Sequence, residues 1–245
     1  MATHRVPCAR YRKAKEEKFR ARSAYKLMDV DDEFHLLANA ARVVDLCAAP
    51  GSWCQVLRRR CPAGAAVVAV DLQPMAPLDG VVVLRGDITT PETAAAVVAA
   101  AGGPADVVVC DGAPEVTGVH DVDEFAHASL MAAAAALAAR LLRPGGAFVA
   151  KLFRCTDAAL VEAQLRCLFV DVDVRKPASS RDRSVEAFVV ARDFRGGCAD
   201  AAFLKKGDLG FAATAAEPPG LALSLIHISE PTRLRRISYA VFCLK

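Results

Sequence analysis

The chain has 245 residues, enough for one α/β domain with its own core, and 24% of them are charged beside 54% hydrophobic. This is a soluble globular composition, and the alanine-rich run over 129–142, interrupted by Arg140, is too short to cross a bilayer. Without an apolar signal core, the amino terminus predicts neither secretion nor membrane attachment, so we expect a cytoplasmic protein. The nine cysteines form no C-x-x-C pair, which favours a reducing compartment and no bound metal.

The net charge of +3 is unevenly distributed along the chain. Residues 1–26 hold nine Lys and Arg against Glu16 and Glu17, so a basic arm precedes a mildly acidic body. This arrangement is typical of a protein that binds a polyanion. A solvated terminus is an alternative, and so is a mitochondrial transit peptide, although the two glutamates and the scarcity of serine count against the latter.

Strands and helices alternate after a first helix, predicted over 23–37 with Ser23 as its N-cap. Short valine-rich runs predict strands buried on both faces, and the segments between them predict helices, which indicates an α/β fold with a parallel sheet. The predicted strands are 42–46, 66–71, 81–84, 106–110, 147–152, 170–174 and 186–192. The predicted helices begin near Ser52, at Pro91 and at Ala158, and another ends near 143–146.

The chain is expected to divide into three segments: a basic arm over 1–22, a folded domain over 23–195 and a C-terminal tail over 196–245. The tail is predicted to lack ordered structure, because a loop-like stretch runs through Pro218, Pro219 and Gly220. Its composition also changes: one isoleucine precedes residue 225 and three follow it. From about residue 224 the sequence resembles read-through from a vector rather than a domain.

The loop after the first strand, Asp45–Trp53, indicates the kind of cofactor. A dinucleotide site would use G-x-G-x-x-G here, but the loop has a single glycine, Gly51. Asp45 would also place negative charge where a pyrophosphate should lie. The loop therefore argues against an oxidoreductase and favours a cationic cofactor without phosphate.

Aspartates follow each of the first four predicted strands, namely Asp45, Asp71, Asp87 and Asp111. A single strand-end aspartate is usually a turn former, but four at the edge where parallel sheets bind ligands favour a binding site. Asp71 is placed to accept from ribose hydroxyls and Asp87 to meet an adenine amine. Trp53, the one tryptophan, is a candidate for the same site, with core packing as the alternative.

Seven stretches occur in the order found in one family: Arg20–Leu27, Asp45–Trp53, Val70–Leu72, Gly86–Thr89, Cys110–Pro114, Phe148–Phe153 and Lys176–Arg181. With them, from about residue 10 to 194, the chain resembles the FtsJ/RrmJ-like ribose 2′-O-methyltransferases. Residues 72–78 and 116–124 resemble the eukaryotic branch that acts on the anticodon loop of tRNA. The implied fold is the Rossmann-like one of S-adenosylmethionine-dependent methyltransferases, with seven mostly parallel strands and the last one antiparallel.

The resemblance implies a cofactor, a substrate and a partner. The cofactor is S-adenosyl-L-methionine, contacted by Gly51, Trp53, Asp71, Asp87 and Asp111. The substrate is the ribose of tRNA nucleotide 32, 34 or both, and a separate WD-repeat subunit is expected to select the nucleotide. Ribosomal RNA, an mRNA cap and a non-catalytic RNA-binding role are the alternatives.

The family's catalytic set matches Lys26, Asp111, Lys151 and Glu186. Topology brings the last three to one edge of the sheet, whereas Lys26 must reach it from the first helix. Two lysines in one pocket disfavour each other's charge, so we expect Lys151 to act as a neutral base while the carboxylates hold the lysines and the ribose. A surface Lys–Glu pair is the alternative.

A basic loop precedes Glu186 and is a second candidate for RNA contact. Arg175, Lys176, Arg181 and Arg183 surround Ser179 and Ser180. Together with the arm, these side chains would grip phosphates on either side of the target nucleotide. A plain solvated loop is the alternative.

Overall fold

The computed structural model describes residues 14, 16–114, 118, 120–153, 158–180, 186–196, 224–225 and 242–243. The chain divides into two compact units, 1–196 and 197–245. In the second unit the described residues form an antiparallel pair, β8 (Ser224–Leu225) and β9 (Phe242–Cys243). Most of the predicted arm and tail lies outside the described residues, so the nature of both stays a prediction.

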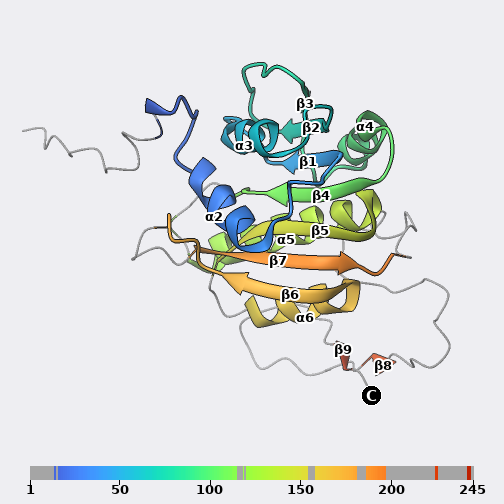
Figure 1. The fold of residues 1–245 in the computed structure, drawn as a ribbon. Coiled ribbons are helices and arrows are strands. Elements are labelled where there is room, and N and C mark those ends of the chain that lie inside the picture. Colours follow the sequence, from blue (N-terminus) through green and yellow to red (C-terminus); the bar gives the residue numbers. More distant parts are fainter. Residues whose placement is uncertain are drawn as a thin grey trace, which may run out of the picture. The chain divides into compact units, whose positions relative to one another are not determined.

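The first unit is built around a seven-stranded sheet with the order β3-β2-β1-β4-β5-β7-β6 (Figure 1). Its strands are β1 (Arg42–Leu46), β2 (Ala66–Asp71), β3 (Val81–Arg85), β4 (Ala105–Cys110), β5 (Leu142–Phe153), β6 (Phe169–Arg175) and β7 (Glu186–Phe194). β7 runs antiparallel to both of its neighbours, and β1 to β5 pair in parallel. The predicted fold class is therefore confirmed.

Helices cover both faces of this sheet (Figure 1). They are α2 (Ala24–Phe34), α3 (Ser52–Arg60), α4 (Pro91–Ala101), α5 (His120–Leu141) and α6 (Ala158–Leu168). Side chains of α2 and α3 share one core cluster with alternate strand residues, among them Val43, Val109, Val149 and Phe188. Because alternate residues of a strand point to the same face, α2 and α3 cover one face, and α4 to α6 contact the sheet on the other.

The sequence placed most element boundaries within two residues, and two of them differ for physical reasons. α2 ends at Phe34 because His35 adopts a left-handed conformation, with φ 54°. β5 begins at Leu142, so its Pro-Gly-Gly stretch lies inside the strand. The pairing register with β4 shifts there, and such an irregularity tolerates a proline that cannot donate a ladder hydrogen bond.

Ser23 occupies the N-cap position of α2, as predicted, although its side chain makes no capping hydrogen bond there. Its hydroxyl instead hydrogen-bonds the hydroxyl of Ser52 at 2.8 Å. Ser52 is the first residue of α3. The contact therefore joins the beginnings of α2 and α3, the two helices that share a face of the sheet.

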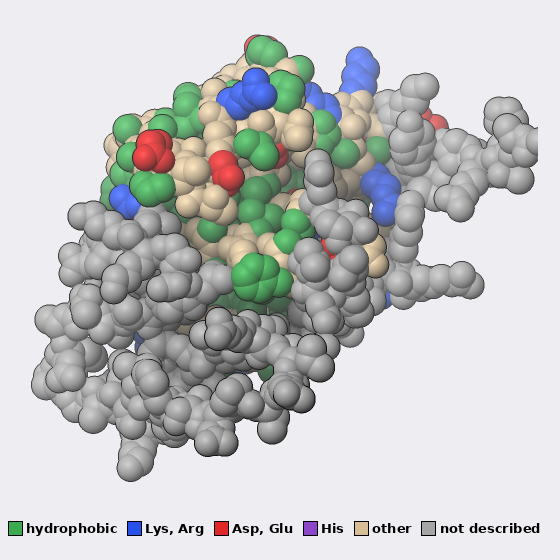
Figure 2. Space-filling model, turned by 180° about the vertical axis from the view of Figure 1, so that it is seen from behind, with side chains coloured by type: hydrophobic (Ala, Val, Ile, Leu, Met, Phe, Trp, Pro, Cys, Tyr) green, Lys and Arg blue, Asp and Glu red, His purple; other side chains and the backbone are tan. Residues whose placement is uncertain are grey.

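On the part of the described surface that is visible from behind, charged side chains are spread out. Figure 2 shows hydrophobic and neutral side chains there, with Lys, Arg, Asp and Glu scattered singly. Large exposed apolar side chains in the described residues include Leu72, Val82, Val83 and Val98. Among the described helices, none has the length and apolarity needed to span a membrane.

Truncation after Gly196 is expected to leave the Tm within about 2 °C of the full chain, because the whole seven-stranded sheet lies in the first unit. Scanning calorimetry of both proteins measures this. Truncation after Val185, which removes β7, is the matched control and should abolish cooperative unfolding. A fall in Tm of more than about 5 °C on truncation after Gly196 would show that the tail stabilises the fold.

Candidate active site

The predicted site residues lie at the carboxyl edge of the sheet, where the strand order reverses. β1 pairs with β2 on one side and with β4 on the other, so the loops that follow β1 and β4 diverge. In register, Leu46 lies beside Val70 and Cys110. Asp71 and Asp111 each follow one residue further along. The acidic side chains predicted from the sequence are thus gathered at the position where such sheets bind small ligands.

Lys151 extends from β5 towards the end of β4. Its Nζ donates to the backbone oxygen of Asp111 at 2.8 Å and lies 3.1 Å from Asp111 Oδ1, an ion pair whose geometry falls short of a hydrogen bond. The two side chains are 11% and 17% exposed. An ammonium group has three donors, and two of them face Asp111. Within the described residues, the third donor direction of Lys151 has no hydrogen-bond partner.

Lys26 reaches the same region from α2 and binds Glu186, the first residue of β7. Its Nζ donates to Glu186 Oε2 at 2.8 Å, and the two side chains are 9% and 13% exposed. The same Nζ lies 5.6 Å from the centre of the Phe188 ring. The alternative of an exposed surface pair is therefore wrong for these residues.

The two ion pairs are neighbours. Lys151 is paired with Phe188 across the strands, and Glu186 lies two residues from Phe188, so Lys151 and Glu186 share a face of the sheet. Burial would raise the pKa of Glu186, but the hydrogen bond and charge of Lys26, with the charge of Lys151, hold this pKa below its usual value. The structure thus brings the four predicted catalytic residues together; their roles stay predictions.

Asp71 is the last residue of β2, and Asp87 lies two residues after the end of the neighbouring strand β3. Both side chains are partly exposed. Asp71 accepts from the backbone N–H groups of Ala49 and Gln73 at 2.8 and 2.7 Å. Asp87 Oδ1 accepts from the N–H and hydroxyl of Thr89 at 2.9 and 2.7 Å. Both carboxylates organise loops and keep further lone pairs for a ligand. Their contacts with ribose and adenine stay predictions.

Asp45 is the most deeply buried acid of this edge, with 1% of its surface exposed. Cys54 Sγ lies 3.0 Å from its Oδ2, whereas its Oδ1 has no hydrogen-bond partner among the described residues. Burial raises the pKa of Asp45 to about 7, against the hydrogen bond from Cys54; the charges of Asp111 and Asp71 add to the rise. A nearby cationic group would favour the charged form of Asp45.

Trp53 and Gly51, two of the predicted cofactor contacts, both lie against other residues of the protein. The Trp53 side chain is 2% exposed, donates its indole N–H to the backbone oxygen of Ser23 at 2.9 Å and packs on Phe188 with ring centres 5.7 Å apart. Its side chain therefore belongs to the core, as the alternative held. Gly51 has φ 99°, and a Cβ there would lie 2.7 Å from the guanidinium of Arg20. Backbone contacts of both residues with a cofactor stay predictions.

His127 is a site residue that the sequence did not reveal. It lies on α5 with 3% exposure and hydrogen-bonds the backbone of Lys151. Burial, followed by the positive charge of Lys151, lowers the pKa of His127 to about 4, although the hydrogen bond opposes the shift. A neutral imidazole therefore holds β5 at Lys151. His127 belongs to no recognisable sequence motif, so only the packing of α5 on β5 reveals it.

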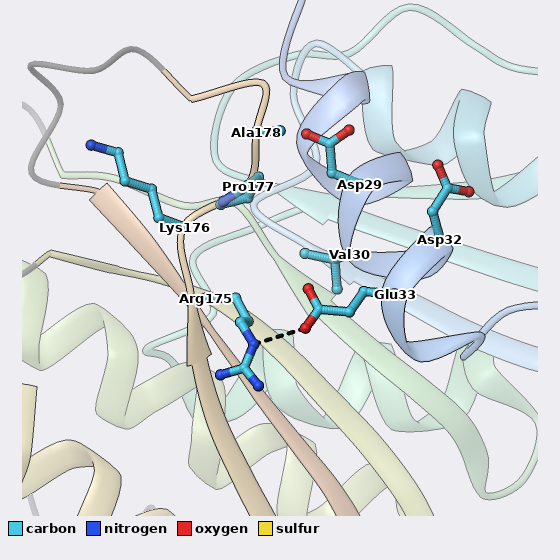
Figure 3. A pocket seen from close by; sticks show the side chains of 8 residues that line it. All are labelled: Asp29, Val30, Asp32, Glu33, Arg175, Lys176, Pro177 and Ala178. Atoms are coloured by element: carbon cyan, nitrogen blue, oxygen red, sulfur yellow. Dashed lines mark hydrogen bonds and ion pairs between the residues drawn. The ribbon is translucent and has the colours of Figure 1, made fainter.

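The basic loop after β6 is fixed against α2. Asp29 Oδ2 accepts from the backbone N–H of Ser179 at 2.6 Å, one helical turn after Lys26. A pocket of about 470 Å³ lies between this loop and α2 (Figure 3). The loop that was predicted to contact RNA is therefore anchored to the helix that carries Lys26.

The basic side chains of this loop differ in what they contact. Arg175 donates to Glu33 at 2.8 Å and pairs with Asp173 at 3.0 Å, so its charge is partly neutralised within the protein. Figure 3 shows Lys176 extending away from the acidic side chains of α2. The other two predicted phosphate contacts, Arg181 and Arg183, lie outside the described residues.

The family model for the FtsJ-like methyltransferases matches residues 19–194, the span that contains the whole site. The chain belongs to this family. Its fold also agrees with a crystal structure described as that of a ribosomal RNA methyltransferase from Plasmodium falciparum. That comparison has a TM-score of 0.65 and 22% identity, and covers 73% of this chain and 100% of the other.

Curated relatives of this FtsJ-like methyltransferase have higher identity. The tRNA (cytidine(32)/guanosine(34)-2′-O)-methyltransferase of Schizosaccharomyces pombe is 52% identical, covering 76% of this chain and 69% of that protein. The human protein of the same name is 54% identical, with 75% and 57% covered. The ribosomal RNA large subunit methyltransferase E of Methanothrix thermoacetophila is 46% identical, with 74% and 71% covered. Matches with these three relatives thus span between 57% and 71% of their lengths.

Asp45→Asn is expected to raise the Tm of this FtsJ-like methyltransferase at pH 8 more than at pH 5. The folded-state pKa of about 7 exceeds the ordinary 3.8, so between these values the folded protein holds a proton that the unfolded chain releases. Stability is therefore lost as the pH rises through this window, and the neutral amide removes the loss. Measuring the Tm of both proteins between about pH 4 and about pH 8, a range that covers the ordinary and the raised pKa, checks this pH dependence. Asp79→Asn, on the exposed loop after β2, is the control. If the plot of Tm against pH for Asp45→Asn runs parallel to that of the wild type, Asp45 does not cause the pH dependence.

Proposed function

We propose that this chain is an S-adenosylmethionine-dependent enzyme that methylates the ribose 2′-hydroxyl of tRNA anticodon-loop nucleotides. The observation that carries the proposal is the placement of two shielded Lys–carboxylate pairs, Lys26–Glu186 and Lys151–Asp111, beside the acidic strand ends of β1 to β4. A methyl acceptor that must lose a proton needs a base, and a cationic donor needs an acidic surrounding. Both kinds of group are adjacent in this site.

The residues present fit S-adenosylmethionine better than a phosphate-bearing cofactor. Burial is the main cause of the raised pKa of Asp45, and the charges of Asp111 and Asp71 add to it, so the three acids are close together and make this edge unfavourable for a pyrophosphate. The buried Asp45 Oδ1 without a hydrogen-bond partner suits a donor or cationic group of a ligand. When bound, the cofactor supplies an electrophilic methyl group on a sulfonium. Asp71 and Asp87 would hold its ribose and adenine.

The protein's own part in the reaction is to orient the ribose hydroxyl and to remove its proton. Lys151 is the proposed base: in the neutral amine the two N–H groups would face the two Asp111 oxygens that lie near Nζ, and the lone pair would be left to accept the hydroxyl proton. His127 fixes the backbone of Lys151 from the opposite face of the sheet. Lys26 and Glu186, the neighbouring ion pair, would orient the ribose. Such positioning contributes to the rate alongside general base catalysis.

The tRNA assignment rests on the names of the relatives. Those from Schizosaccharomyces pombe and Homo sapiens, at 52% and 54% identity, are named for nucleotides 32 and 34 of tRNA. We further propose that the basic arm contacts phosphates, that the protein acts in the cytoplasm, and that a WD-repeat subunit selects the nucleotide. Ribosomal RNA is the second candidate, because a relative at 46% identity is named for it.

Lys151→Ala is expected to slow methyl transfer at least about 10²-fold, the usual lower bound for losing a general base. Lys151→Arg should be almost as slow, because a guanidinium stays protonated and cannot accept the hydroxyl proton. Single-turnover rates at saturating tRNA and cofactor measure the chemical step without contributions from weakened binding. An Arg variant that runs near the wild-type rate would show that Lys151 is a phosphate clamp rather than the base.

Purified protein with tRNA and S-adenosylmethionine is expected to methylate the ribose of nucleotide 32, 34 or both, read by mapping 2′-O-methyl groups. Deproteinised ribosomal RNA and capped mRNA, supplied in parallel, should stay unmethylated. The Lys151→Ala protein is the matched control for a contaminating activity. Methylation of ribosomal RNA alone would reverse the substrate assignment. The absence of transfer to any RNA, with the WD-repeat subunit of a related tRNA methyltransferase added, would favour the non-catalytic alternative.

A further inference from the structure

Arg20 lies at the end of the predicted basic arm, but its guanidinium is engaged by the protein rather than directed to solvent. Its Nη1 donates to the backbone oxygens of Pro50 and Ala76 at 3.0 and 2.7 Å. Its Nη2 donates to the backbone oxygen of Pro77 at 2.6 Å. Pro50 belongs to the loop after β1, and the other two carbonyls belong to the loop after β2. One side chain therefore ties together the two loops that begin the cofactor site.

The backbone at Arg20 is itself held on α3. The N–H of Arg20 donates to Gln55 Oε1 at 2.7 Å, and Gln55 Nε2 donates back to the oxygen of Lys18 at 2.9 Å. Arg59 stacks over the Phe19 ring at 4.1 Å. The guanidinium is thus presented from a fixed segment, which lowers the entropy cost of holding the two loops.

The loop after β2 has little regular structure of its own, so contacts such as those of Arg20 hold it in place. Residues 72–80 contain neither helix nor strand and are largely exposed; Met75 and Leu78 pack partly on a small core cluster. A Cβ on Gly51 would lie 2.7 Å from Arg20 Nη1 and 2.9 Å from Met75 Sδ. The absence of a side chain at Gly51 therefore gives Arg20 its room between the loops.

We propose that Arg20 is a positioning residue for cofactor binding, which holds the loop after β1 against the loop after β2. The inference rests on the proposed function, because these loops carry Gly51 and follow Asp71. An arginine is needed, since its planar fork presents separate N–H groups to separate carbonyls, whereas a lysine offers a single nitrogen. This is a different task from the phosphate contact that the basic arm predicts, and it assigns one arginine of that arm to the cofactor.

The test compares Arg20→Lys and Arg20→Ala with Arg22→Ala in the full chain. Arg22 is the matched control, because its side chain makes no hydrogen bond or ion pair within the described residues. We expect both Arg20 variants to raise the KM for S-adenosylmethionine at least about tenfold, in keeping with the loss of hydrogen bonds to a charged donor. The kcat at saturating cofactor and the KM for tRNA should stay within about twofold of the wild type, and Arg22→Ala should leave the cofactor KM unchanged.

An Arg20→Lys protein whose cofactor KM lies within about twofold of the wild type overturns the inference. Asp71→Ala separates this failure from a failure of the proposed function: if the wild type binds S-adenosylmethionine and Asp71→Ala weakens binding, only the Arg20 assignment falls. If the wild type itself does not bind S-adenosylmethionine in calorimetry, the proposed function falls first.

A double-mutant cycle keeps the proposal testable if loss of Arg20 also lowers the Tm. Gly51→Ala should raise the cofactor KM, because its Cβ would collide with Arg20. In the Arg20→Ala background the additional effect of Gly51→Ala should be clearly smaller, since one of its two close neighbours is gone. Fully additive effects would show that Arg20 and Gly51 act independently and would overturn the inference.

Discussion

The reversed direction of β7 between β5 and β6 is the constraint on which the site depends. β7 begins at the edge where the parallel strands end, so its first residue, Glu186, arrives beside Lys151 near the end of β5. A parallel seventh strand would place Glu186 at the opposite edge of the sheet. The antiparallel pairing also places Phe188 opposite Lys151 across the strands, with the Phe188 ring 5.6 Å from Lys26 Nζ. Shielding from water strengthens the ion pairs in which these lysines take part.

α2 completes the site and depends on contacts far along the chain. Lys26 and Glu186 are separated by 160 residues, and their bond fixes the helix over the end of the sheet. Trp53 holds the start of the helix through Ser23, and Asp29 holds the loop before β7. Removing one partner of a shielded ion pair typically costs about 3–5 kcal/mol, because the other charge stays buried. The geometry of the candidate site and the stability of this region therefore rest on the same contacts.

Two kinds of charged group lie side by side along the carboxyl edge of the sheet: clustered acids and Lys–carboxylate pairs. The strand ends of β1 to β4 gather acids; burial, with a further contribution from the charges of Asp111 and Asp71, raises the pKa of Asp45, and this edge suits a cationic ligand. Lys26 of α2 lies against Glu186 at the start of β7, and Lys151 of β5 lies against Asp111 after β4, while burial keeps His127 beside Lys151 neutral. A cationic methyl donor and a hydroxyl that must lose a proton would thus meet opposite kinds of surroundings. The N-terminal segment contacts both parts of the site, since Arg20 holds the loops after β1 and β2 and Lys26 forms the ion pair with Glu186.

The sequence by itself determined the α/β fold, nearly all strand boundaries and the row of strand-end aspartates, because valine-rich runs, turn residues and the direction of parallel strands are local signals. It also placed Asp111, Lys151 and Glu186 at one edge, since that placement follows from strand direction alone. Only the tertiary structure decided that Lys26 reaches Glu186, that the Trp53 side chain packs in the core, that β5 begins before Pro144, and that Arg20 and His127 support the site. These outcomes depend on which side chains meet across the sheet after packing, and the periodicity of a single segment does not encode its distant neighbours.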